Sequence, residues 1–403
     1  MAKGTLIEKS VTVKAPPETV FRFFTAPADV REWLCDRALA EAKKGGAYHF
    51  EWMSGWWARG VFEKVKAPKV LAFTWFGPGE PKESKVEVAL KRTGGATKVT
   101  LKHSGVGSTG NWKSARNEIE KGWTNSLENL KSVIETGIDL RFARRPVLGI
   151  GLEPVTPELA KKEGLQVKSG IWIGSVEKDS GAAKAGLQKG DIIVGLDGRT
   201  IDTYESLIMA LQKHRANDTV KVRVNRSGRK QETPVTLGAR PIQDLPATHE
   251  EAVTVLRKSR EEMGAELDKL VAGADETQAE KKPAPEKWCA KEALAHLIMT
   301  ETTSRTGLIG QFAGDVLDSN ENITVYPEAL KAIMSATPNV PLLTDRLKRE
   351  MGETLSVFEA LRPEFQAHRA RYRRTYNDLK YLAEHARHHF KQFDLAMQGK
   401  PMA

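Results

Sequence analysis

The sequence predicts a multidomain α+β protein, in which two β-containing segments precede an all-α bundle. Three observations predict this class. Seven of the nine tryptophans lie before residue 124, glycines are frequent between residues 148 and 238, and the residues after 248 show long amphipathic helix patterns. Since a chain of 403 residues exceeds one ordinary core, at roughly 100–200 residues per domain, we expect three domains: residues 1–140, 145–241 and 247–399.

Alternating apolar and polar residues in the first segment predict an antiparallel sheet. A proline pair at Pro16 and Pro17 favours a helix start, and this helix would turn Val20, Phe21 and Phe24 inward. Apolar residues at helical spacing then predict a long helix over residues 113–135, suited to lie across a curved sheet. The expected strands are residues 11–13, 47–52, 61–65, 70–76, 86–90 and 98–103.

This order of elements, with the stretches APPETVFRFFTAPADVREW, GGAYHFEW, LAFTWF, TKVTLKHSG and EKGWTNSLENL, resembles the START-like (SRPBCC) superfamily over about residues 5–136. The branch is the one named after the activator of heat-shock-protein ATPase. The resemblance implies a helix-grip fold with a cavity for a small apolar ligand between the sheet and the long helix. Its candidate lining residues are Trp52, Trp75 and Trp123, together with Trp56 and Trp57. The alternative is a filled core with a few exposed aromatic residues.

Turn-forming residues mark the ends of the elements expected in the second segment. Gly186, Gly190 and Gly198 supply tight turns around a strand at residues 192–194, and residues 182–185 predict a short helix. Asp202 or Thr203 can cap the next helix, in which Leu207 and Leu211 share one face.

The stretches PVLGIGLEPVTPELAKKEGL, SGIWIGSVEKDSGAAKAGLQKGDIIVGLDGRTI and VKVRVNRSGRKQETPVTLGARP resemble a PDZ domain of the HtrA-protease type. The resemblance implies a β-sandwich or barrel that binds the C-terminal peptide of a partner protein as an added strand. By this resemblance, Val147, Leu148, Gly149 and Ile150 bind the peptide's terminal carboxylate, and Leu207 and Leu211 form the wall of the side-chain pocket. The alternative is a groove filled by the protein's own chain or by a neighbouring domain. No serine-hydrolase nucleophile motif accompanies the domain.

Four amphipathic helices are expected in the third segment, arranged as an up-down bundle. Thr248 and Glu251 form a capping box for a helix that ends near Val271. A polar loop follows over residues 272–287, and Cys289 then takes the place of a serine or threonine cap. The remaining helices are expected from about residue 288, at 342–361 and at 376–397.

Three histidines in this bundle form a candidate metal site. His385 and His389 are four residues apart and share one helix face, close to the stripe of Tyr381, Leu382 and Phe393. Two buried imidazoles would repel one another if charged and would need partners if neutral, and a metal ion satisfies both demands. His296, between two leucines, is the candidate third ligand. The alternative is an ordinary core histidine at each position, and we expect His368 and His388 to face solvent.

Trp288-x7-His296, followed by His385-x3-His389-x2-Gln392, resembles the DinB family of metal-binding four-helix bundles over residues 249–398. The resemblance implies that His296, His385 and His389 bind a divalent transition metal, with Gln392 supporting His389. An imidazole set suits zinc, nickel or iron. Glu301 is either an acid/base group or a surface residue. The sequence departs from the family pattern in Cys289 and in a long connection at residues 314–341.

The composition of the chain limits the classes of binding partner that we expect. The formal charge of +10 is spread along the chain, and its short basic clusters lack an aromatic recognition motif, so we expect no nucleic-acid partner. Two cysteines cannot form a disulfide framework. The N-terminal residues lack a signal-peptide core, and no apolar run of about 18 residues predicts a membrane span. We therefore expect no membrane partner and a cytoplasmic location.

Two functions remain open. The first is a non-catalytic scaffold that combines an apolar-ligand domain, a peptide-binding domain and a metal-binding bundle. The second is a metal-dependent enzyme, such as the thiol-linked transferases implied by some DinB relatives, with two recruitment domains. Since one domain of the three shows candidate chemistry and no general base is identified, we favour the scaffold.

Overall fold

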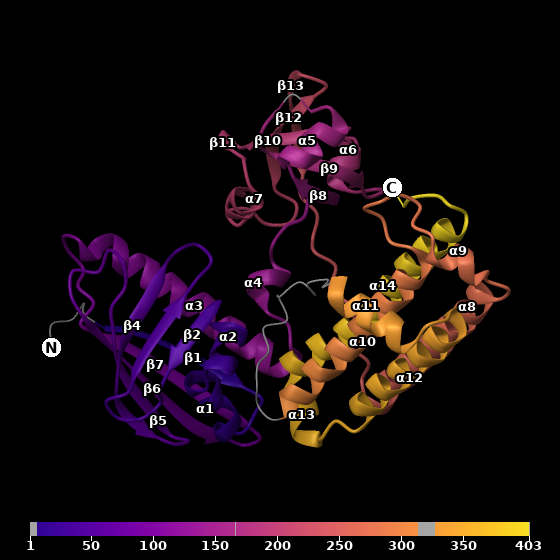
Figure 1. Ribbon diagram of the computed structural model, residues 1–403. Helices are drawn as coiled ribbons and strands as arrows, with labels where there is room; N and C mark the ends of the chain where they lie inside the picture. Colours follow the sequence, from indigo (N-terminus) through magenta and orange to yellow (C-terminus); the bar gives the residue numbers. More distant parts are fainter. Residues whose placement is uncertain (1–5, 166, 313–326, 403) are drawn as a thin grey trace. The chain divides into compact units, whose positions relative to one another are not determined.

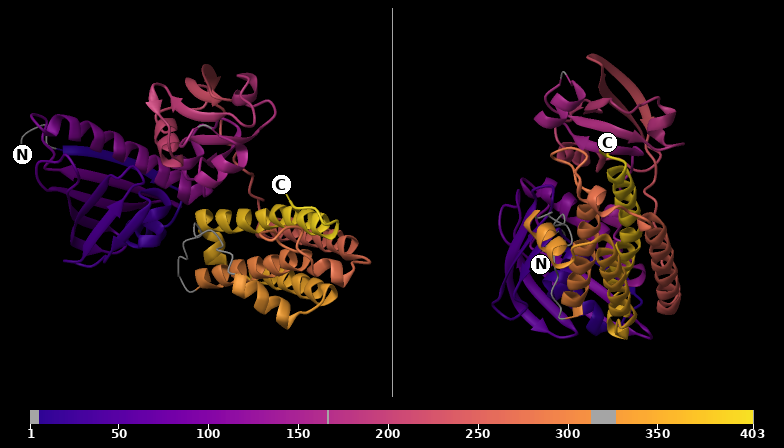
Figure 2. Two further views of the ribbon diagram at one scale, coloured as in Figure 1. Left: turned by 45° about the horizontal axis from the view of Figure 1, so that its top comes forward. Right: turned by 45° about the vertical axis from the view of Figure 1, so that its right-hand side comes forward.

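The computed structural model describes residues 6–165, 167–312 and 327–402 (Figures 1 and 2). It divides into two compact units, Met1–Ile242 and Gln243–Ala403. The first unit carries two antiparallel sheets, and the second carries a helical bundle. The predicted α+β class and the helical C-terminal bundle are thereby confirmed. None of the helices in the described ranges is long and apolar enough to span a membrane.

The first sheet has seven strands in the order β1-β7-β6-β5-β4-β3-β2. All neighbouring strands are antiparallel. The strand β2 was missed by the sequence analysis because its four residues, RALA, show no apolar alternation that would mark a buried face. The strands are β1 (Leu6–Val13), β2 (Arg37–Ala40), β3 (Ala47–Glu51), β4 (Trp57–Lys66), β5 (Val70–Trp75), β6 (Ser84–Thr93) and β7 (Ala96–Ser104).

Three helices accompany this sheet: α1 (Pro17–Thr25), α2 (Pro27–Trp33) and α3 (Trp112–Thr136). The long helix α3 matches the predicted one, and its apolar stripe is buried as expected. Helix α2 was not predicted, because its seven residues are too few for a helical period to stand out.

A buried hydrogen-bond chain joins α3 to the sheet through His103, which has no exposed surface. The indole N–H of Trp123 donates to Nδ1 of His103 at 3.0 Å, and Nε2 of His103 lies 2.7 Å from Oγ of Ser84. Because an indole nitrogen can only donate, Nδ1 of His103 is the acceptor and Nε2 carries the proton. Ser84 in turn donates to the carbonyl of Trp75 at 3.1 Å. His103 is thus a satisfied core residue in one tautomer.

The second sheet has the strand order β13-β12-β10-β9-β8, and β11 pairs with β10. The strand β8 therefore forms an edge. The short helix α6 and the predicted strand at residues 192–194 are both present, and Thr203 caps α7 in a capping box with Ser206. The strands are β8 (Ile150–Pro154), β9 (Ile171–Val176), β10 (Ile192–Leu196), β11 (Arg199–Thr200), β12 (Thr219–Arg226) and β13 (Arg229–Thr236). The helices are α4 (Leu140–Ala143), before this sheet, α5 (Pro157–Glu163), α6 (Gly181–Lys184) and α7 (Tyr204–Leu211).

Four long helices build the bundle: α8 (His249–Val271), α10 (Ala290–Phe312), α12 (Val340–Glu359) and α14 (Arg369–Met397). Helices α8 and α10 each pack against both α12 and α14, so α8 and α10 lie on a diagonal. The capping box of Thr248 and Glu251 begins α8, and α8 ends at Val271 as predicted.

Three short helices fall between the long ones: α9 (Glu276–Glu280), α11 (Pro327–Ala336) and α13 (Pro363–Ala367). Helix α9 lies in the segment that we expected to be a loop. Helix α11 lies within the expected connection at residues 314–341, of which residues 314–326 fall outside the described residues. Helix α14 begins seven residues before the predicted start at 376, where His368 caps it by accepting from the N–H of Arg371.

The buried His103 predicts an acid-sensitive fold. Burial lowers the pKa of His103 from 6.5 to about 3, so the unfolded chain binds a proton between these pH values and the folded chain does not. Stability is therefore lost as pH falls from 6.5 towards 3, by up to about 1.4 kcal/mol per pH unit. The measurement is denaturant unfolding at several pH values, followed by tryptophan fluorescence.

The variant His103→Gln is the control, because an amide can accept from Trp123 and donate to Ser84 but does not titrate. Its stability is expected to depend less steeply on pH than that of the wild type in this window. An equal dependence of the unfolding free energy on pH in the two proteins would show that His103 is not the titrating group.

Candidate metal centre and two further candidate sites

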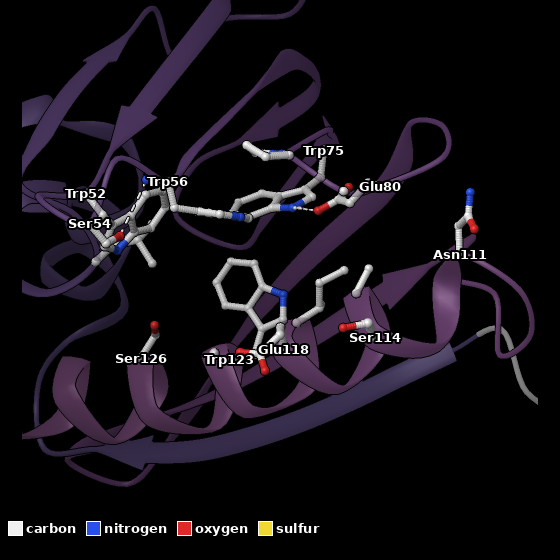
Figure 3. A pocket seen from close by; sticks show the side chains of 16 residues that line it. Trp52, Ser54, Trp56, Trp75, Glu80, Asn111, Ser114, Glu118, Trp123 and Ser126 are labelled. Carbon is white, nitrogen blue, oxygen red and sulfur yellow. Dashed lines mark hydrogen bonds between the residues drawn. The ribbon is translucent and has the colours of Figure 1, made fainter. Parts of the chain in front are cut away.

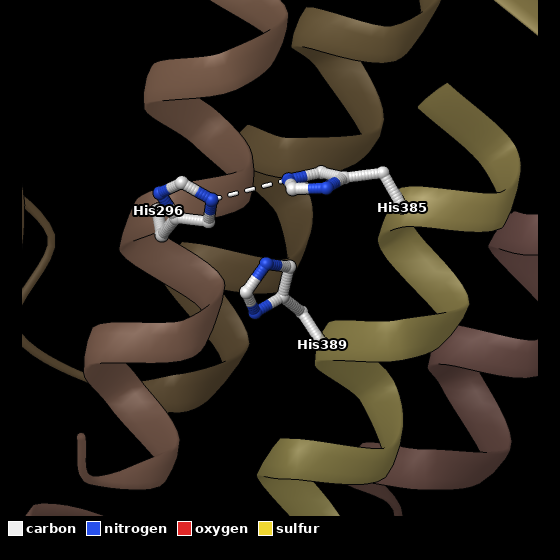
Figure 4. A group of neighbouring side chains, drawn as sticks. All are labelled: His296, His385 and His389. Carbon is white, nitrogen blue, oxygen red and sulfur yellow. Dashed lines mark hydrogen bonds between the residues drawn. The ribbon is translucent and has the colours of Figure 1, made fainter. Parts of the chain in front are cut away.

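The three predicted histidines meet in the interior of the bundle (Figure 4). His296 projects from α10, while His385 and His389 project from α14. One ring nitrogen from each lies within 4.8 Å of the others. Nε2 of His296 is 3.1 Å from Nε2 of His385. His296 and His389 are buried and His385 is half-buried.

The start of α10 is fixed by the thiol cap that the sequence predicts. The N–H of Glu292 donates to Sγ of Cys289 at 3.5 Å, and the N–H of Cys289 donates to Oε2 of Glu292 at 2.8 Å. This arrangement is a capping box with sulfur in place of a hydroxyl. Trp288, just before the cap, packs its ring 4.9 Å from His296 and stacks on His389 at 5.7 Å. The indole thus covers two of the three imidazoles.

Burial keeps the three imidazoles neutral. Burial, followed by the neighbouring histidines, lowers the pKa of His296 to about 3. Burial likewise lowers the pKa of His389 to about 4 and lowers the pKa of His385. A neutral imidazole has the lone pair that a metal ion requires. The pocket therefore holds its ligand candidates in the binding form at neutral pH.

Gln392 orients one of these rings. Its Oε1 lies 2.7 Å from Nδ1 of His389. An amide oxygen can only accept, so Nδ1 carries the proton and Nε2 of His389 keeps its lone pair. His296 differs, because its Nδ1 is buried and has no hydrogen-bond partner in the described structure.

The donor set fits a metal ion. Nitrogen ligands about 2.0–2.1 Å from a tetrahedral ion lie roughly 3.3 Å apart, which is close to the 3.1 Å between His296 and His385. Three imidazoles leave a coordination position open for water or another ligand. The triad could therefore hold a metal ion.

Other residues of the bundle differ from expectation. Glu301 is 4% exposed and is therefore not a surface residue. It forms an ion pair with the buried Arg260 of α8. Tyr381 is 61% exposed and does not belong to the buried stripe, although its ring lies 6.2 Å from that of His385. His388 is exposed as predicted, whereas His368 is half-buried and caps α14.

The loop before β8 carries the predicted carboxylate-binding residues. The carbonyl of Leu148 accepts from the N–H of Ala182, and the carbonyl of Gly149 accepts from the N–H of Glu177. In the described part of the chain, the N–H groups of Leu148 and Gly149 donate to no protein acceptor. Val147 differs, because its N–H donates to the carbonyl of Gly238 at 2.9 Å.

Gly149 is required by this loop for two reasons. Its φ is +77°, and a Cβ at this position would lie 2.3 Å from Cβ of Ser180. Ile150, the last residue of the predicted set, begins the edge strand β8. The proposed wall residues Leu207 and Leu211 share the inner face of α7, where they are 0% and 8% exposed and pack in the domain core.

A pocket of about 490 Å³ lies between the first sheet and α3 (Figure 3). Trp52, Trp75 and Trp123 line it, and so does Trp56. Trp57 does not, because Arg59 lies over its ring and it contacts Phe76. Glu80, a loop residue, also lines the pocket but was not predicted. No periodic pattern marks a loop position, so no sequence signal could have found it.

Three family models match the chain in succession. They are "Activator of Hsp90 ATPase homolog 1-like protein" over residues 14–135, "PDZ domain" over residues 146–237 and "DinB superfamily" over residues 259–393. These matches confirm the three predicted resemblances and their order.

Curated relatives match part of the chain. A "Probable periplasmic serine endoprotease DegP-like" from Halomonas elongata is 26% identical over 203 residues, which are 50% of this chain and 40% of that protein. A protein of the same description from Marinomonas sp. is 39% identical over 97 residues, which are 24% of this chain and 21% of that protein. The chain thus spans less than half the length of these relatives.

Solved structures also resemble part of the chain. Protein MLL2253 from Mesorhizobium loti is 22% identical, with a TM-score of 0.30, over 32% of this chain and 96% of that chain. An HSP90 activator from Plasmodium falciparum is 24% identical, with a TM-score of 0.29, over 32% of this chain and 96% of that chain.

Replacing Gly149 is expected to destabilise the carboxylate loop. Gly149→Ala places a Cβ against Ser180, which adds ~1–3 kcal/mol of overpacking to the strain of a positive φ. Hydrogen exchange of the amides in α6 and β9 measures the local opening free energy.

Gly164→Ala is the matched control, because its φ is +64° and nothing lies within 4 Å of the added Cβ. This variant is expected to lower the opening free energy only by the backbone strain, roughly 1–2 kcal/mol. If the two variants lowered the local opening free energy equally, the contact with Ser180 would not constrain the loop.

Proposed function

We propose that this chain is a non-catalytic binding protein with three domains, at residues 1–140, 145–241 and 247–399, that bring different ligands together. The observation that carries the proposal is the triad: three imidazole nitrogens converge within 4.8 Å. The one carboxylate singled out as a general base, Glu301, is neutralised by Arg260. Such a site is better equipped to bind than to move protons.

The bundle's proposed ligand is a divalent transition metal, zinc, nickel or iron, held by His296, His385 and His389. The support is the lowered pKa of all three imidazoles and the contact between His389 and Gln392. Gln392 would keep the ring of His389 in the ligating orientation. A bound ion would supply a Lewis acid with at least one exchangeable position.

The PDZ-like domain is proposed to bind the C-terminal peptide of a partner protein. The support is the pair of N–H groups on Leu148 and Gly149, which donate to no acceptor in the described structure and lie just before the edge strand β8. Two such groups can donate to a carboxylate while the peptide pairs with the edge. Ile150 would continue the contact, and Leu207 and Leu211 would lie beneath the side-chain pocket.

The first domain is proposed to bind a small apolar ligand between Trp52, Trp75 and Trp123, in the 490 Å³ pocket. Indole surfaces and a volume of this size suit a small organic molecule. The proposed location is the cytoplasm, with neither nucleic acid nor a membrane as a partner.

A second candidate function is a metal-dependent enzyme of the thiol-linked transferase type. The observation that favours it is the open position left by a three-imidazole set. A metal in this site would stabilise the thiolate form of a bound thiol. Turnover of an electrophile with added thiol, lost on metal removal, would favour the enzyme, whereas binding of metal without turnover would favour the scaffold.

The metal site predicts about one equivalent of a transition metal per chain in the purified protein, measured by elemental mass spectrometry. The double variant His385→Ala and His389→Ala is expected to lose the metal, because one imidazole cannot hold it alone. Gln392→Ala is expected to weaken metal affinity by about 10–100-fold.

His388→Ala is the control, since His388 is on the same helix but exposed. It should retain the wild-type metal content. A wild-type protein that stays metal-free after incubation with zinc and with nickel would overturn the metal proposal.

The peptide site predicts a preference for a free carboxylate. Peptides from a random C-terminal library should bind the full chain, and amidated copies of the same peptides should bind about tenfold more weakly. Fluorescence anisotropy measures both. Equal affinities for the acid and the amide would contradict a role for the N–H groups of Leu148 and Gly149.

A further inference from the structure

The pocket under α3 is acidic in a basic protein. Among the described residues, its lining of 16 includes two carboxylates, Glu80 and Glu118, and no lysine, arginine or histidine. The chain as a whole has a formal charge of +10. A pocket with walls of low polarity concentrates the field of its own charges, so this one attracts cations more strongly than the surrounding surface does.

Glu80 is the unusual member of this lining, because it is a buried acid with no cationic partner among the described residues. It is 7% exposed; its Oε1 accepts from the indole N–H of Trp75 at 3.0 Å, and its Oε2 is buried without a hydrogen-bond partner in the described structure. Burial raises the pKa of Glu80 to about 7. Two other buried acids of the described chain, Asp191 and Glu301, are paired with Arg226 and Arg260.

Four indoles surround the same space. Trp75 lies between Trp56 and Trp123, at ring-centroid distances of 6.0 and 5.2 Å, and Trp52 packs on Trp56 at 4.8 Å. Figure 3 shows Trp75 and Trp56 on the sheet side, with the ring of Trp123 rising from α3 opposite them and Glu118 close to the same helix. The neighbouring rings are tilted by 34° to 66°, so they form a curved wall and not a flat stack.

We propose that this pocket binds an organic cation, an ammonium group carried on a small apolar body. The indole faces would attract the positive charge, since an aromatic ring is negative above its plane. Glu80 would supply the countercharge from within, and the exposed Glu118 would do so from the mouth on α3. The inference rests on the proposed ligand-binding role of the first domain and names the chemical class of its ligand.

The same contacts disfavour the other ligand classes. An anion would meet two carboxylates and no basic side chain in the lining. A neutral apolar ligand would fill the space and favour the protonated, uncharged form of Glu80, so it would gain nothing from the carboxylate. A cation would be attracted both by the faces of the indole rings and by the carboxylate of Glu80.

The test compares two probes of nearly equal shape: choline and the neutral alcohol dimethylbutanol, in which carbon replaces the ammonium nitrogen. Isothermal titration calorimetry on the full chain measures both affinities. Choline is expected to bind at least about fivefold more tightly than the alcohol. Glu80→Gln should remove most of this difference while it keeps an acceptor for the Trp75 indole, and Glu118→Gln should reduce it less.

Two matched controls separate charge from packing. Glu120→Gln removes an acid from α3 that pairs with Lys9 outside the pocket, and it should leave the preference for choline unchanged. Trp56→Leu keeps an apolar lining but removes one ring and should lower the preference. Trp57→Leu, outside the lining, should not.

The outcomes distinguish this inference from the broader proposal. If the alcohol bound as tightly as choline, the pocket would be an apolar site, so the cation inference would fail and the proposed apolar ligand would survive. If neither probe bound, the inference would fail as well. Binding of the neutral dye Nile red, reduced by Trp56→Leu, would then show whether the apolar-ligand role stands without it.

Discussion

The candidate metal centre depends on the packing of α10 against α14. Small side chains are buried on both helices: Ala293 and Ala295 on α10, and Ala383 and Ala386 on α14. Ala295, Ala383 and Ala386 belong to one apolar cluster. Small residues allow two helices to approach closely, because the interaxial distance follows the side chains at the contact. Close packing of α10 and α14 helps to bring Nε2 of His296 within 3.1 Å of Nε2 of His385. Polar groups are thus brought together by an apolar interface.

The sequence predicts much of this bundle, because its signals are local. A spacing of four residues places His385 and His389 on one face, and the capping residues Thr248 and Cys289 mark helix starts that the structure contains. Such patterns depend on helix geometry, which is the same in any protein. The long helix α3 and most strands of the first sheet were also predictable, because their apolar residues recur at the regular spacing of a helix or a strand.

Features that depend on tertiary contacts were not predictable. The partner of Glu301 is Arg260, 41 residues away on the diagonal helix, and nothing in the local sequence indicates this pairing. Glu80 follows no periodic pattern, and its burial results from the way its loop folds back over Trp75. The short helices α2 and α9 fall below the length at which periodicity is informative. Local sequence patterns therefore predict helices and strands, whereas the partners of a buried charge can be identified only in the folded structure.

The edge strand β8 is short and irregular. A bulge separates Gly151 from Leu152 in its pairing with β9, and Pro154, which has no N–H, ends the strand. An open sheet edge is a template on which copies of a protein can join strand to strand, and long regular edges carry the greatest risk of such aggregation. The bulge and the proline interrupt that template after a few residues. The second sheet can therefore keep an edge open to a short chain end while it resists pairing with the sheets of neighbouring molecules.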